Sequence, residues 1–116
     1  VFQGCLQYSP VTSKKEGTDM KGKFPIGRLV ATQGVANLMQ EEPGFERFAK
    51  DAFRRYLNAD WGEMCESDKQ QNDMAVIHKD NRIFASYENA AHPGWKLWII
   101  TEYDHSATTL LFPSEY

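Results

Sequence analysis

The sequence has few of the features that mark several common classes of protein. It contains only two cysteines, Cys5 and Cys65, which lie 60 residues apart. That number is low for a disulfide-rich secreted domain, and the spacing does not suit a paired metal-ligand motif. No apolar run approaches the roughly 18 residues that a membrane span needs, and no signal peptide is recognisable. These absences predict a cytoplasmic protein, without a membrane segment, whose cysteines are free thiols.

An excess of positive charge is also lacking. The chain has 13 basic and 16 acidic residues, a formal net charge of −3 and an isoelectric point near 5.6. A nucleic-acid-binding domain usually shows a basic face or an isoelectric point above about 9, so the charge balance argues against DNA or RNA as a partner. The length of 116 residues and a hydrophobic content of 41% suit one domain with a sizeable core.

Residues 1–19 show no sustained hydrophobic period and are rich in Ser, Thr, Gly and Lys. The opening "VFQG" is close to the "LFQG" of a common protease-cleavage tag, but these residues could equally be native sequence from an upstream start. In either case we predict a flexible, weakly anchored arm over residues 1–19 and a single domain over 20–116.

The remaining sequence predicts both helices and strands. The clearest segment is 45–57, in which apolar residues recur at helical spacing with charged residues between them. In chain order we expect a strand over 26–32, helices over 34–42, 45–57 and 67–77, and strands over 82–88, 96–104 and 108–113.

The order of these elements predicts the fold class. Two short connectors, 89–95 and 105–107, favour an antiparallel meander of the last three strands. Leu97–Ile100 is apolar without alternation, so the middle strand should be buried on both faces. We therefore predict an α+β, two-layer fold: a C-terminal three-strand meander and one N-terminal strand pack against two or three helices.

The polar stretch after the middle strand is the first candidate site. Glu102 and Asp104 are two residues apart and would point to one face of a strand, with His105 next to them. A carboxylate pair near an imidazole could perform general acid–base chemistry. The same residues are typical of a polar turn, in which Asp and Ser bind local backbone groups. We name Glu102, Asp104 and His105 as candidate catalytic residues and leave both interpretations open.

A second group of oxygen ligands lies in the segment 60–73. Its acidic and amide residues could hold Mg²⁺ or Ca²⁺, but helix capping explains them as well, and the twelve-residue loop pattern of a calcium hand is absent. The members are Asp60, Glu63, Asp68, Asn72 and Asp73. We predict no bound metal and no cofactor. Asn72 should face the packed side of its helix and need a buried partner, and Trp61 should fill the edge of the core.

The histidines and aromatic residues allow further interpretations. His78, His92 and His105 all fall at predicted turns or helix ends, so we expect them on the surface, and a Cys65–histidine pair has no local signature. Five aromatic residues lie on or beside the meander, where they either stabilise the sheet or form a partner-binding face. They are Tyr87, Trp95, Trp98, Tyr103 and Tyr116.

Four blocks together resemble a family of small bacterial proteins carried on plasmids, phages and other mobile elements, often labelled "plasmid-related protein". The blocks are "KFPIGRLVATQGV" (23–35), "NADWGEMCESDKQQND" (58–73), "RIFASY" (82–87) and "LWIITEYDHSATTLLFPSEY" (97–116). The matching residues are Pro25, Gly27, Ala31, Thr32, Gly34, Asp60, Trp61, Gly62, Asp68, Asn72, Asp73, Trp98, Thr101, Glu102, Asp104, Thr108, Thr109, Pro113 and Tyr116. The resemblance spans Met20–Tyr116, implies Met20 as the usual start and carries no catalytic role with it.

These observations predict an accessory protein that acts by binding a host or element-encoded protein, as a monomer or as a homodimer formed through the final strand or the aromatic face. Candidate binding residues are Trp61, Asn72, Glu102, Thr108 and Thr109. The alternative is a small metal-assisted hydrolase or nuclease-like enzyme, which requires Glu102, Asp104 and a group from 60–73 to converge. A toxin-like RNA-binding module is a third possibility, by fold-level analogy only, and the acidic charge argues against it.

Overall fold

A computed structural model describes residues 8–10, 24–78 and 81–116 of the chain. Strands and helices in this part follow the order β1 (Tyr8–Pro10), β2 (Arg28–Thr32), α1 (Gln33–Glu41), α2 (Pro43–Leu57), α3 (Glu66–His78), β3 (Ile83–Glu88), β4 (Lys96–Thr101), β5 (Ala107–Leu111) and a final 3₁₀ turn, η2 (Pro113–Glu115). The predicted α+β class is confirmed. No helix among the described residues is long and apolar enough to cross a membrane.

The strands form one mixed sheet in the order β1-β2-β5-β4-β3. The predicted meander is confirmed, because β4 pairs antiparallel with both β3 and β5. The N-terminal strand β2 lies parallel to β5, with Leu29 opposite Thr108. The final strand is therefore interior to the sheet. The predicted dimer through that strand is wrong, since both of its edges are already hydrogen-bonded.

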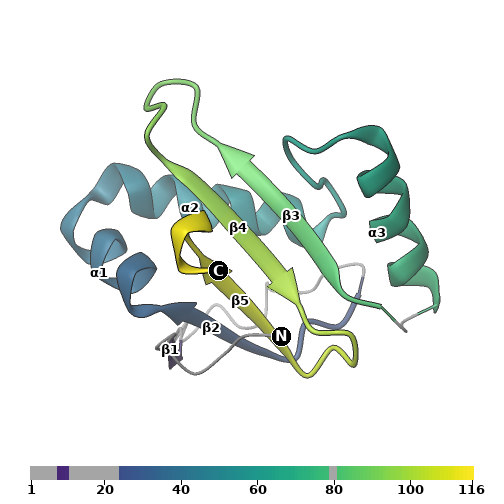
Figure 1. Cartoon of the computed structure of the whole chain (residues 1–116). Helices are drawn as coiled ribbons and strands as arrows, with labels where there is room; N and C mark the ends of the chain where they lie inside the picture. Colours follow the sequence, from purple (N-terminus) through teal and green to yellow (C-terminus); the bar gives the residue numbers. More distant parts are fainter. Residues whose placement is uncertain (1–7, 11–23, 79–80) are drawn as a thin grey trace.

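Helices α1 and α2 cover one face of the sheet, whereas α3 lies beside the outer strand β3 (Figure 1). The core fills the space between the two layers, and its side chains come mainly from α2 and from alternate positions of β3, β4 and β5. Those buried most completely include Val35, Phe45, Ala49, Tyr56, Ile83, Ala85, Tyr87, Leu97 and Ile99. The two-layer prediction thus holds for α1 and α2, while α3 packs beside the edge strand β3.

Local sequence explains where the first two helices begin. Thr32 ends β2 and its side-chain oxygen accepts a hydrogen bond from the Val35 N–H at 3.3 Å, which caps α1. The Thr32 hydroxyl in turn donates to the Glu115 carboxylate at 2.6 Å, which ties η2 to this corner. Pro43 begins α2 at a position where the missing N–H costs nothing. The expected break between the helices over 34–42 and 45–57 is therefore confirmed, and Pro43 is the first residue of the second helix.

The aromatic residues expected near the meander are divided between the two faces of the sheet, and Trp95 packs against Phe45 and Phe48 of α2 on the helix-covered face. Trp98 on β4 packs edge-on against Phe84 of β3, with ring centroids 4.8 Å apart, and also contacts Tyr116 at 5.7 Å. Tyr87 points into the core instead and is fully buried. Tyr103 and Tyr116 stay largely exposed.

The predicted N-terminal arm falls mostly outside the described residues, as does Cys5. Within it, Tyr8–Pro10 forms the short strand β1, which pairs antiparallel with β2 and places Tyr8 opposite Thr32.

The segment that leads into β2 is anchored by its backbone. Phe24 is buried against the rings of Tyr56 and Trp61, and the Arg28 N–H donates to the Ser106 carbonyl at 3.0 Å. Between them Gly27 has a φ of +65°, and a Cβ at this position would overlap the backbone carbonyls of His105 and Ser106. Only glycine allows this close approach without strain.

Replacing Gly27 with alanine should therefore destabilise the fold by at least about 2 kcal/mol, through the left-handed backbone and the clash with Ser106. Urea unfolding measures the loss. Gly94→Ala is the matched control, because Gly94 borders open space, and its stability should change by less than about 0.5 kcal/mol. Equal stability of the two variants would contradict the tight approach at Gly27.

Candidate functional site

The turn between β4 and β5 uses its polar groups to reverse the chain. The Glu102 N–H donates to the Ala107 carbonyl at 3.0 Å, and the His105 N–H donates to the Glu102 carbonyl at 2.8 Å. The exposed Asp104 carboxylate accepts the Ser106 N–H at 3.0 Å. Hydrogen bonding by Ser106 holds the pKa of Asp104 below its usual value. Asp104 therefore stabilises the turn as an ordinary ionised group.

Glu102 lies just beyond the strand on which it was expected. Strand β4 ends at Thr101, and the half-buried Glu102 belongs to the turn. The expectation of a carboxylate on a strand buried on both faces is wrong for this residue. The strand ends one position before Glu102, whose N–H already closes the turn by donating to the Ala107 carbonyl.

His105 was expected on the surface, and the structure contradicts this. Its side chain is 8% exposed and its backbone adopts a φ of +58°. Nδ1 lies 2.9 Å from the Pro25 carbonyl oxygen, so Nδ1 carries the proton and donates it. Nε2 is buried and has no hydrogen-bond partner in the described part of the chain. The imidazole thus attaches the segment before β2 to the turn, and it does not face the carboxylates of Glu102 and Asp104 as a catalytic base would need to.

A chain of buried hydroxyls begins directly beside this turn. Tyr56 Oη lies 2.6 Å from Thr101 Oγ1, Thr101 Oγ1 lies 2.7 Å from Thr108 Oγ1, and Thr108 donates to the Ile26 carbonyl at 2.7 Å. Each hydroxyl has one proton. Because Thr108 gives its proton to Ile26, Thr101 must donate to Thr108 and Tyr56 must donate to Thr101. Burial raises the pKa of Tyr56, so the phenol keeps the proton that this chain requires.

The hydroxyl chain gives Thr108 a structural role, and Thr109 is not part of it. The Thr108 side chain joins β5 to β4 through Thr101 and to the segment before β2 through Ile26, and the bond between Thr101 and Tyr56 continues the chain to α2. Thr109 points to the opposite face of the sheet, where it is 3% exposed. All three protons of the chain are committed to structural bonds, so none of these hydroxyls is free to act as a nucleophile.

The acidic segment 60–73 forms a second polar cluster, along the outer edge of β3. The Arg55 guanidinium binds the Asp60 carboxylate at 2.9 and 3.2 Å, and Asp60 also accepts the Gly62 N–H at 3.2 Å. Trp61 is buried as expected, and its indole N–H donates to the Asp73 carboxylate at 2.9 Å. Hydrogen bonding by Arg55 lowers the pKa of Asp60, against a smaller opposite effect of burial. These carboxylates therefore have partners within the protein.

Asn72 has the buried partner that the sequence called for. It is 4% exposed, its side-chain N–H donates to the Phe84 carbonyl at 2.7 Å, and its side-chain oxygen accepts the Phe84 N–H at 3.2 Å. These are the two bonds that a neighbouring strand would make with Phe84. The amide side chain thus takes the place of a further strand at the open edge of the sheet.

Glu63 closes the rest of the same edge. Its N–H donates to the Ser86 carbonyl at 2.7 Å, and its carboxylate accepts the Glu88 N–H at 2.9 Å. The chain reaches β3 here through Gly62, whose φ is +77° and whose missing side chain leaves room for the Ser86 carbonyl. Residues 84, 86 and 88 of β3 therefore all have outward backbone groups bound by the segment 62–72.

The two polar clusters do not converge. The turn of Glu102 and Asp104 follows Thr101, which pairs with Ile83 at the start of β3. Asn72 lies near that end, but both polar atoms of its side chain bind the Phe84 backbone, whereas Glu63 binds at the other end of β3. Over residues 8–10, 24–78 and 81–116, no group of three or more His, Cys, Asp and Glu side chains is placed to hold a metal ion. Cys65 is an exposed free thiol. The geometry that the enzyme alternative requires is not found among these residues.

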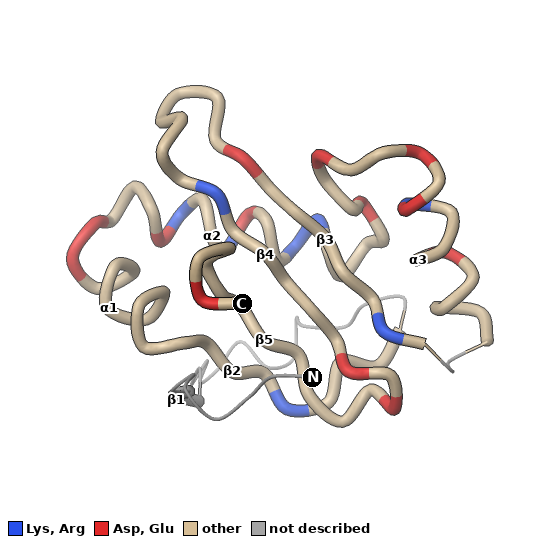
Figure 2. Tube along the Cα trace, viewed as in Figure 1, with Lys and Arg blue, Asp and Glu red and all other residues tan. Residues whose placement is uncertain are grey.

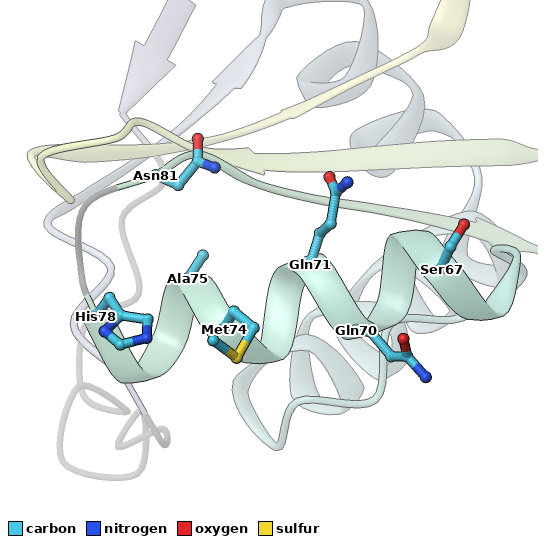
Figure 3. A pocket seen from close by; sticks show the side chains of 7 residues that line it. All are labelled: Ser67, Gln70, Gln71, Met74, Ala75, His78 and Asn81. Atoms are coloured by element: carbon cyan, nitrogen blue, oxygen red, sulfur yellow. The ribbon is translucent and has the colours of Figure 1, made fainter.

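A shallow hollow of about 550 Å³ lies along α3 (Figure 3). It is lined by Ser67, Gln70, Gln71, Met74, Ala75, His78 and Asn81. Figure 3 shows Ser67, Gln71 and Ala75 pointing from the helix toward the side on which Asn81 lies, with Met74, His78 and Gln70 beside them. Among the residues that the structure describes, the lining contains amides, a hydroxyl, an imidazole and a thioether, and no carboxylate, ammonium or guanidinium group.

The outward side of α3 carries two exposed apolar side chains. Ala75 faces the sheet together with Asn72, but Met74 is 52% and Ile77 68% exposed. At 100° per residue, six residues without formal charge occupy an arc of about 120°, and the charged residues of the helix lie outside that arc. The arc consists of Ser67, Gln70, Gln71, Met74, Ile77 and His78; we call it the neutral face of α3. Figure 2 shows that the C-terminal turns of α3 carry no Lys, Arg, Asp or Glu.

Sequence reasoning did not single out the neutral face as a site. The signal was present as a lack of charge along one side of a helix that elsewhere contains Glu66, Asp68, Lys69 and Asp73. The neutral face becomes evident once the buried side of the helix is known. Asn72 faces the sheet, which leaves Met74 and Ile77 on the outward side.

No family model, curated protein or solved structure was found to match this chain.

Thr101→Val should cost about 1–3 kcal/mol, because it removes the central hydroxyl of the buried chain and leaves Tyr56 Oη and Thr108 Oγ1 each short of one bond. Thr109→Val is the matched control on the neighbouring strand, and its stability should change by less than about 1 kcal/mol. Urea unfolding of both variants measures the difference. A Thr101→Val protein as stable as Thr109→Val would show that the hydroxyl chain does not stabilise the fold.

Asp60→Asn should remove the ion pair with Arg55 and lower stability at pH 7 by about 0.5–1 kcal/mol, the value of a partly exposed pair. Folding lowers the pKa of Asp60 from its ordinary value of 3.8. The stabilisation is therefore complete above that pH and is lost as the pH falls through the folded-state pKa. Unfolding curves at pH 7 and pH 3 measure this, and the deficit of the variant should shrink at the lower pH. A constant deficit would contradict the charge interaction.

Proposed function

We propose that this chain is a protein-binding accessory domain of a bacterial mobile element, and that its docking surface is the neutral face of α3 with the adjoining hollow. The observation that carries the proposal is the exposure of Met74 and Ile77 on a helix face without formal charge. A solvated helix face normally presents charged residues. Exposed apolar side chains that are grouped on one element are typical of interaction sites.

The lining of the hollow indicates the kind of partner. Gln70, Gln71 and Asn81 supply amide donors and acceptors for neutral polar groups, and Met74 supplies a flexible apolar contact. Phosphate or carboxylate recognition would need Arg or Lys at the hollow, and neither is found among its described lining residues. The partner segment is therefore uncharged, with an apolar anchor and exposed backbone or amide groups, which points to a protein.

The polar clusters elsewhere support binding over catalysis. Asp60, Asp73 and Asp104 bind groups of the same chain, and the hydroxyls of Thr101 and Thr108 are engaged in the buried chain. The resemblance to proteins of plasmids and phages supports a host or element-encoded protein as the partner.

A comparison of two double variants tests the proposal. Met74→Lys with Ile77→Lys places two charges on the docking surface, whereas Gln40→Lys with Tyr103→Lys places the same charges on other exposed sites. Bacterial proteins retained by the tagged wild-type chain should bind the control normally and the first variant at least about tenfold less. Quantitative mass spectrometry of the retained proteins measures this, and circular dichroism verifies that both variants fold.

Two results would overturn the proposal. One is a set of retained proteins that is the same for both double variants, since binding would then use another surface. The other is the absence of any protein retained above an empty resin. A protein that is lost only with the Met74 and Ile77 variant is then purified, and titration calorimetry with the wild-type chain verifies direct binding.

A further inference from the structure

We infer that His105 is a pH-sensitive clamp, which holds the segment 24–27 against the turn between β4 and β5 while its imidazole is neutral and releases that segment when the ring takes up a second proton. The clamp contains none of the residues of the neutral face of α3, so it is independent of the proposed function. It gives a regulatory role to a buried titratable group that takes no part in docking.

A single hydrogen bond holds the His105 ring in its neutral form. Nδ1 lies 2.9 Å from the Pro25 carbonyl oxygen, which can only accept, so this nitrogen carries the proton. A neutral imidazole has one such proton, and Nε2 is therefore an acceptor. Nε2 is buried and has no hydrogen-bond partner in the part of the chain that the structure describes. The site thus fits the neutral ring in one tautomer.

A second proton makes this site unfavourable for the ring. It turns Nε2 into a donor without an acceptor among the described residues, and it places a full charge on a side chain that is 8% exposed. A buried donor that makes no hydrogen bond lowers stability, and a buried charge without a partner lowers it further. Both costs end when the ring turns out into water, and this movement breaks the bond to Pro25. Proton uptake at Nε2 and opening of the clamp are therefore coupled.

Among the described residues, the groups around the ring provide no ion pair for an imidazolium. On one side lies Phe24, whose ring centroid is 6.2 Å away, and Phe24 in turn contacts Tyr56, whose phenol stays neutral because burial raises its pKa. The turn itself supplies Glu102 and Asp104, and neither carboxylate is bonded to the imidazole. Asp104 is exposed and accepts the Ser106 N–H, so water screens its charge. A proton at Nε2 would therefore be buried without a counter-charge.

Opening the clamp frees one end of the segment 24–27. Beyond the bond to the imidazole, the Thr108 hydroxyl donates to the Ile26 carbonyl at 2.7 Å, and the N–H of Arg28, whose side chain is exposed, donates to the Ser106 carbonyl at 3.0 Å. These two bonds come later in the chain and remain when the imidazole leaves. The freed end carries Phe24, whose buried ring belongs to the core. Acidification therefore loosens the edge of the core at Phe24 first.

His105→Asn is the variant that separates the charge of the clamp from its geometry. The asparagine Nδ2 takes the place of Nδ1 and can donate to Pro25. Asparagine also tolerates the φ of +58° at this position. The variant keeps the bond and the backbone conformation but cannot take up a proton, so its stability should not respond to pH in the range in which histidine titrates.

Urea unfolding between pH 7 and pH 5 measures the response. An unfolded histidine takes up its second proton near an ordinary pKa of about 6.5. Below that pH the unfolded chain binds one proton more than the folded protein, so the stabilisation is complete above about pH 7 and is lost as the pH falls. The ratio of unfolded to folded wild-type protein should rise at least about tenfold over this range, and that of His105→Asn less than about threefold. Equal changes in the two proteins would overturn the clamp.

Two controls assign the response to His105. The double variant His78→Asn with His92→Asn changes two exposed side chains and leaves His105 as the remaining histidine of the chain. It should keep the full wild-type response, and a lost response would overturn the clamp even if His105→Asn does not fold. Asp60 and Asp104 do not contribute, because hydrogen bonding lowers the pKa of both and they stay ionised over this range.

Hydrogen exchange tests whether the segment opens locally. The Arg28 N–H should exchange faster than amides in the middle of β4, because its opening does not need the whole protein to unfold. After correction for the intrinsic exchange rate, this opening should become about tenfold more frequent from pH 7 to pH 5 in the wild-type chain and stay constant in His105→Asn. An Arg28 amide as protected as those of β4, or one that opens equally at both pH values, would overturn the release of the segment.

Discussion

The pair of hydrogen bonds between the Asn72 amide and the backbone of Phe84 determines how α3 lies against the sheet. Strand β3 is the outer strand, and its free N–H and C=O groups would otherwise be open to pairing with another chain. Asn72 and Glu63 bind these groups from within the same molecule. Because the amide of Asn72 must face Phe84, the rotation of α3 about its own axis is set, and Met74 and Ile77 are turned outward.

By covering the backbone edge of β3, α3 leaves its own outward face exposed. The helix protects the backbone edge of β3 with a polar side chain, and Ala75 and the partly buried Val76 supply its apolar contacts with the core. Met74 and Ile77 remain on the outward side, on a helix face without formal charge. The inward position of Asn72 therefore has two consequences. It closes the edge of the sheet at Phe84, and it leaves the neutral face of α3 exposed.

The C-terminal polar residues have a different task, which is to hold the segment before β2 in place. His105 binds the Pro25 carbonyl, and Thr108 binds the Ile26 carbonyl. Through Thr101 and Tyr56, the same bonds reach α2. Carboxylates, an imidazole and hydroxyls that lie close together in the sequence thus serve separate structural bonds. Proximity in sequence does not make them a catalytic group, because their side chains point to different parts of the fold.

The sequence by itself determined the α+β class, the meander and the aromatic helix. Each follows from hydrophobic periodicity or turn residues, which are local properties. The tertiary structure alone decided that β2 lies parallel to β5, that His105 is buried and that Met74 and Ile77 face solvent. Those features depend on contacts between residues far apart in the chain, such as His105 with Pro25 and Asn72 with Phe84. Local sequence cannot specify such partners. A histidine in a turn is usually exposed, and His105 is buried only because the distant Pro25 carbonyl binds it.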